Sequence, residues 1–162
     1  MNEQERMDAA FRCFCEFLDG EGLNYQAETN EGEDKRILMG FSDNELPLRA
    51  VFAFEAAASR IYIGSLLPFT ATAERADELL MAVLRVNQIV AVGTFCVTEE
   101  GEVTFESNET LAGVGGISTE YPARVIGSTF AALERYGGQL AAVARGESMA
   151  TDIRYVGGED EE

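Results

Sequence analysis

The chain has 162 residues, and 29 acidic against 12 basic side chains give it a formal net charge of −17 at pH 7. The absence of histidine excludes catalytic triads built on imidazole and every imidazole metal ligand, and the acidity disfavours nucleic acid and anionic membranes as partners. The 46% of hydrophobic residues are enough for a folded core.

We expect one folded domain over residues 1–156 and an acidic, disordered tail over residues 157–162. The N-terminus carries acid where a secretory signal would carry Lys or Arg, and no segment approaches the roughly eighteen apolar residues of a membrane span. These features predict a soluble, cytoplasmic protein. Its cysteines, Cys13, Cys15 and Cys96, fit neither a CxxC redox pair nor a zinc site, and we interpret them as buried or half-buried structural thiols.

The first 67 residues predict one helix and four strands. Residues 7–18 place apolar side chains at helical spacing, and Gly20 is a natural end for this helix. Four segments with strand-like patterns follow, most of them joined by short polar turns: residues 23–29, 36–41, 48–55 and 60–67. Pro68 is expected to end the fourth strand.

A second helix is expected next, with Thr70 or Thr72 as its N-cap. Its predicted apolar stripe consists of Ala76, Leu79, Leu80, Val83, Leu84 and Val90. Asn87 falls near the centre of this stripe, so its amide should be at least partly buried and should need hydrogen-bond partners. Free backbone groups where the helix turns into the next strand would supply them most simply, although a ligand contact is the alternative.

Two further strands, residues 91–98 and 102–108, are joined by a turn in which Gly101 suits the left-handed position of a hairpin. The glycine-rich connector at 111–117 fits neither GxGxxG nor the P-loop pattern, which disfavours phosphate binding there. A third helix should begin at a cap formed by Ser118 or Thr119 and bend or break at Gly137-Gly138. The element order predicts an α+β fold with a mainly antiparallel sheet flanked by three helices.

No catalytic residue, cofactor site or metal ligand can be assigned from a motif. Acidic side chains in two predicted turns could supply oxygen ligands to a hard cation, but neither turn has EF-hand spacing: Glu31, Glu33 and Asp34 in one, Asp43 and Glu45 in the other. A small carboxylate- or metal-dependent enzyme and a cation-responsive regulator therefore remain as alternative functions.

Residues 86–97 and 100–105 resemble the YbjN family of bacterial proteins, which are described as sensory transduction regulators. In that family a helix ends in an Asn-containing turn, and a Gly-x-Phe strand, an acidic-Gly hairpin and a second strand follow. The matching positions here are Asn87, Gly93, Phe95, Gly101 and Phe105. The resemblance implies a fold similar to the type III secretion chaperones, small acidic dimers that hold a partner polypeptide in an extended form.

We therefore expect a non-enzymatic binding or regulatory protein, a homodimer without cofactor, that holds a protein partner on an apolar surface. The candidate surface is the second helix with the strand after it, where Met81, Val92, Thr94 and Cys96 could add apolar area to a two-fold contact. The alternative is that these residues complete the core. Negative charge around an apolar patch would keep the free protein soluble and favour basic partners.

Overall fold

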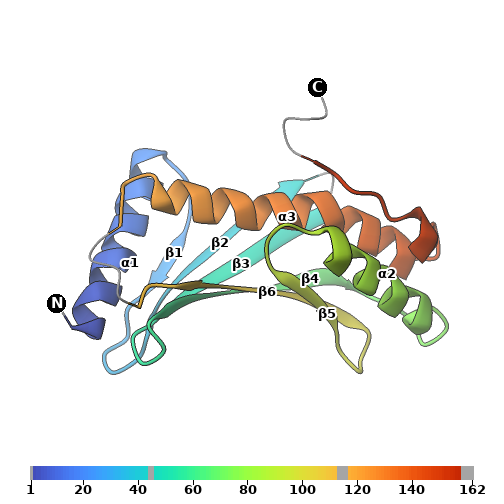
Figure 1. Cartoon of the computed structure of the whole chain (residues 1–162), viewed down its shortest axis with the longest axis horizontal. Helices are drawn as coiled ribbons and strands as arrows, with labels where there is room; N and C mark the ends of the chain where they lie inside the picture. The colour runs from blue at the N-terminus through green and yellow to red at the C-terminus, as the bar shows by residue number, and fades with distance from the viewer. Residues whose placement is uncertain (1, 44–45, 113–116, 158–162) are drawn as a thin grey trace.

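The computed structural model describes residues 2–43, 46–112 and 117–157, and these form one antiparallel sheet with three helices on one of its faces (Figure 1). The strand order is β1-β2-β3-β4-β6-β5. The predicted fold class and element order are confirmed. The elements are α1 (Glu3–Gly20), β1 (Gln26–Glu28), β2 (Lys35–Asp43), β3 (Leu46–Glu55), β4 (Arg60–Thr70), α2 (Ala76–Ile89), β5 (Thr94–Val97), β6 (Glu102–Thr110), α3 (Tyr121–Ala144) and a short 3-10 turn, Ala150–Asp152.

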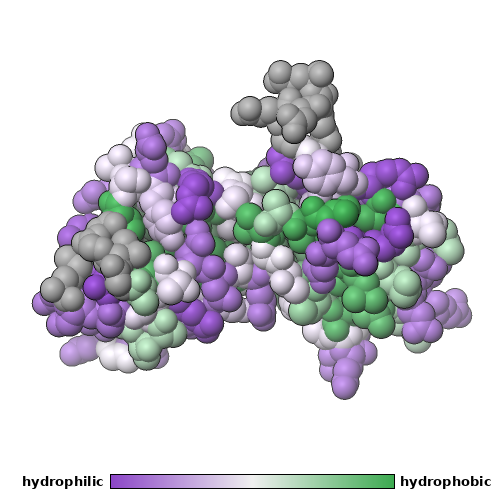
Figure 2. Space-filling view, viewed as in Figure 1, coloured by the Kyte–Doolittle hydropathy of each residue, from purple (hydrophilic) through white to green (hydrophobic). Residues whose placement is uncertain are grey.

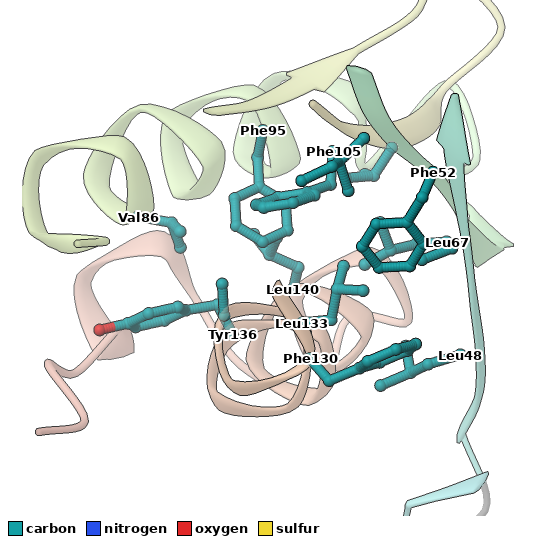
Figure 3. Close-up of a cluster of buried hydrophobic side chains, with 14 of the residues drawn as sticks. Leu48, Phe52, Leu67, Val86, Phe95, Phe105, Phe130, Leu133, Tyr136 and Leu140 are labelled. Carbon is teal, nitrogen blue, oxygen red and sulfur yellow. The ribbon is translucent and has the colours of Figure 1, made fainter. Parts of the chain in front are cut away.

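The core lies between the helices and the covered face of the sheet. Alternate residues of β3, Leu48, Ala50, Phe52 and Phe54, are buried because successive side chains of a strand point to opposite faces. Figure 3 shows Leu133 and Leu140 of α3 directed toward aromatic side chains of the sheet. Two of these, Phe95 and Phe105, pack with their ring centroids 5.0 Å apart and join the last hairpin to the core.

Helix α1 begins with a capping box. The Asn2 side chain accepts a hydrogen bond from the backbone N–H of Glu5, whose carboxylate accepts one from the backbone N–H of Asn2. This arrangement satisfies two backbone donors that the helix itself leaves unpaired. Phe14 of the buried helix face then packs edge-on against Phe54 of β3, with the ring centroids 5.2 Å apart.

An ion pair ties α1 to the sheet and gives a pH-dependent prediction. Nζ of Lys35 lies 3.0 Å from Oδ1 of Asp8, and its hydrogen bond lowers the pKa of the Asp8 carboxyl below the ordinary 3.8. The pair therefore stabilises the fold fully at pH values well above 3.8, and this contribution is lost as the pH falls through the folded-state pKa. Since both side chains are about one-third exposed, we expect Asp8→Asn to cost at most about 1 kcal/mol at pH 7.

Urea denaturation at neutral pH and at about pH 3 checks this expectation, with the exposed Glu16→Gln on the same helix as control. The stability difference between wild type and Asp8→Asn should shrink at the lower pH. A difference of the same size at both pH values would contradict the role of the ion pair.

Several predicted boundaries are wrong. β4 continues past Pro68 to Thr70, because the pairing of β4 with β6 shifts between Leu66 and Thr70, and a proline in such an irregularity removes no ladder hydrogen bond. Neither Thr70 nor Thr72 caps α2. Its N-cap is Arg75, whose guanidinium donates to the carbonyl oxygens of Val143 and Ser148 and so joins the start of α2 to the end of α3.

The third helix also differs from its prediction. Its N-cap is Glu120 and makes no side-chain capping bond, so neither Ser118 nor Thr119 has that role. The helix runs through Gly137-Gly138 without a break. A Cβ on Gly137 would lie 3.2 Å from Cδ2 of Leu46, so this glycine lets α3 approach the sheet closely.

Candidate partner-binding surface

Helix α2 has a wider apolar arc than the core covers. Leu79, Ala82, Val83 and Val86 are buried, whereas Leu80 and Leu84 of the predicted stripe are 48% and 51% exposed. One residue advances a helix by about 100°, so Leu80 turns away from the core beside Leu79, and Leu84 follows it one turn later. The predicted stripe therefore combined two faces, a buried one and an exposed apolar one.

The exposed apolar face of α2 lies beside the edge strand β5. Met81 is 53% exposed next to Leu80 and Leu84. On β5, Thr94 and Cys96 are exposed and flank the buried Phe95. Figure 2 shows hydrophobic residues gathered over the half of the molecule that contains α2, whereas the half with α1 is mainly hydrophilic. We name Leu80, Met81, Leu84, Thr94 and Cys96 the α2–β5 surface.

The amide of Asn87 joins α2 to β5. Nδ2 of Asn87 donates to the carbonyl oxygen of Phe95 at 2.8 Å, and the backbone N–H of Phe95 donates to Oδ1 of Asn87 at 2.9 Å. The half-buried side chain thus forms hydrogen bonds with both the backbone N–H and the carbonyl of one residue, which are the groups that a neighbouring antiparallel strand would pair with. These partners are backbone groups after the helix end, but they belong to the strand that starts at Thr94 and not at Ala91.

Two glycines set the path of the chain around β5. Gly93, before the strand, has φ +80°, and a Cβ there would overlap the buried ring of Phe105. Gly101, in the hairpin after it, has φ +82°, and a Cβ there would lie 2.7 Å from the carbonyl oxygen of Ala71. Both positions combine a left-handed backbone with a close neighbour, which glycine alone tolerates without strain. Val92, the remaining predicted contact residue, is half-buried and lines a small cavity with Tyr136 and Tyr155.

Most of the chain matches one known protein family. Residues 14–142 match the model of the YbjN family, which is described as "putative bacterial sensory transduction regulator". The chain belongs to the YbjN family. The match extends from α1 through every strand and most of α3, and it includes α2 and β5. No curated protein matches the chain in sequence.

The YbjN family is described by regulation and not by an enzymatic reaction. In this member burial raises the pKa of the Cys13 and Cys15 thiols, so both are neutral at pH 7 and are poor nucleophiles. Cys96 is exposed, which corrects the expectation of a buried or half-buried thiol. Cys96 lies on β5 and is one of the residues that define the α2–β5 surface.

The sequence offered two acidic turns as alternative cation sites and disfavoured phosphate binding at the glycine-rich connector. Within the described residues no three Cys, Asp or Glu side chains are grouped so that they could hold a metal ion. Glu45, residues 113–116 of the glycine-rich connector and residues 158–162 of the predicted tail lie outside the described residues. Across the same described ranges, none of the helices has the length and apolarity needed to cross a membrane.

Proposed function

We propose that this YbjN-family chain is a non-enzymatic, cytoplasmic regulatory protein that forms a homodimer through the α2–β5 surface and holds a protein partner in a chaperone-like way. The observation that carries the proposal is the exposure of Leu80, Met81 and Leu84, each about half, on one face of α2. Large apolar side chains that gather on one exposed face are typical of interaction sites. Covering each of them would contribute about 1 kcal/mol to association.

A two-fold contact suits this surface because each α2 would meet its own copy, and the same apolar side chains would then be buried twice. The excess of acid has a separate role in the proposal. With a net charge of −17 on each chain, the dimer attracts basic partners over long range, and association should slow as salt screens the charge.

The first test is the solution mass by light scattering at low and high salt. We expect a mass near twice 17.6 kDa at both salt concentrations, because an apolar contact is weakly screened. Leu84→Lys should give a monomer, since it places a charge in the centre of the contact. Leu66→Lys is the matched control, because Leu66 is 56% exposed but lies on β4, away from α2.

Cys96 provides a second measurement on the same proteins. In the dimer its thiol should react with a maleimide more slowly than in the Leu84→Lys monomer, because the partner covers it. A monomeric wild type, or an equal loss of dimer in both leucine variants, would contradict the proposed contact.

A further inference from the structure

The face of the sheet opposite the helices carries a groove of ≈ 750 Å³. It crosses β3, β4 and β6, and its apolar lining includes Pro47, Val51, Leu66 and Pro68. Two guanidinium groups, those of Arg36 and Arg49, border these side chains. Positive charge beside an apolar groove is unusual in a chain whose formal net charge is −17.

The two arginines differ in their partners. Arg36 forms an ion pair with Glu28 of the neighbouring strand β1. Glu106 is the acid that lines the groove, and burial together with the negative charge of Glu106 raises the pKa of the neighbouring Tyr62 hydroxyl. Within the described part of the chain, the guanidinium of Arg49 has neither an ion pair nor a hydrogen bond. Arg49 is thus the cation that the groove leaves available to a ligand.

Two glycines on the same face leave space around the groove. A Cβ on Gly64 would lie 3.0 Å from the ring of Tyr62, and a Cβ on Gly40 would lie 3.3 Å from Cγ of Arg49. Strand pairing places Gly64 between Val51 of β3 and Glu106 of β6, on the floor of the groove. A residue with a side chain at this position would crowd Tyr62.

We propose that this groove binds an extended segment of a protein partner that carries one carboxylate between apolar side chains, with the carboxylate paired to Arg49. The apolar walls take the flanking side chains, and the guanidinium of Arg49 selects the acid. A groove on an open sheet face suits a peptide better than a small molecule, because small ligands are bound in sites that enclose most of their surface. The acidity of the whole chain disfavours segments with several carboxylates.

The inference rests on the proposed function only in taking the partner to be a protein, and it can fail independently. The test is an amide NMR titration of the full chain with two pools of synthetic peptides. Both pools carry terminal lysines and mixed Leu, Val, Ile and Phe flanks, and they differ only in a central Asp or Asn. We expect amide shifts along β3 and β4 around the groove, and binding about ten-fold weaker for the Asn pool.

Arg49→Gln should remove the preference for the Asp pool. Arg12→Gln, which removes the same charge from the exposed side of α1, should keep it. Shifts confined to helix α2, the part of the α2–β5 surface that does not pair with the groove strand β6, would support partner binding as proposed above but would overturn the groove as its site. Equal affinity for the two pools, no shift with either pool, or an unchanged preference in Arg49→Gln would also overturn the inference.

Discussion

Replacing Gly93 with alanine is expected to lower the free energy of unfolding by about 2–5 kcal/mol, the sum of backbone strain and overpacking. The backbone at Gly93 has φ +80°, and the added Cβ would overlap the buried ring of Phe105 and lie 3.0 Å from the carbonyl oxygen of Glu106. Phe105 packs against Phe95 inside the core, so its ring has little space to move. Urea denaturation, monitored by circular dichroism, measures this loss of stability.

Gly32→Ala is the matched control for this experiment. Gly32 has φ +81°, nearly the same as Gly93, but no atom outside its chain neighbours lies within 4 Å of its ideal Cβ. Gly32→Ala should therefore lower the free energy of unfolding only by the strain of the left-handed backbone, about 1–2 kcal/mol. Equal losses in the two variants would mean that the contact with Phe105 is not the reason for glycine at position 93.

Replacing Asn87 with leucine is expected to destabilise the fold by about 1–3 kcal/mol, with a lower melting temperature. Leucine has a similar size but neither donor nor acceptor, so the backbone N–H and carbonyl of Phe95 would both lose their side-chain partner. Helix α2 would also lose its polar connection to β5. Thermal and urea denaturation of the variant test the structural role predicted for this residue.

Gln88→Leu provides the comparison, because Gln88 is the next residue of the same helix and is exposed. The two substitutions remove the same chemical group and differ in its surroundings. Gln88→Leu should change stability by no more than about 0.5 kcal/mol. If the melting temperature of Asn87→Leu equalled that of the wild type, the two hydrogen bonds would contribute nothing to stability, and the structural role would be wrong.

Sequence periodicity predicted the order and type of all three helices and six strands, because helices and strands bury apolar residues with different periods. It did not place their ends. Pro68 was expected to stop β4, but the local irregularity against β6 accommodates it. Gly137-Gly138 was expected to break α3, but Gly137 faces leucines of the sheet, and this contact depends on residues about ninety positions earlier in the chain. Such long-range contacts leave no local pattern.

The candidate surface was partly predictable. Met81, Thr94 and Cys96 were expected near a contact surface, and the structure leaves all three exposed. Leu80 and Leu84 were assigned to the core, although the width of the apolar arc on α2 could have indicated a second face. The groove with Arg49 could not be predicted, because it requires β4 and β6 to be neighbours, and strand order does not follow from periodicity.

The amide of Asn87 has a consequence for how sheets of separate copies could join. An exposed strand edge is a template for β-augmentation, but at Phe95 the outward backbone groups of β5 are already occupied by Asn87. At the opposite edge, β1 pairs only with residues 36–38 of β2, so within the described residues no strand lies beside the rest of β2. Pairing between the sheets of separate copies is therefore expected along the open part of β2 and not at Phe95 of β5.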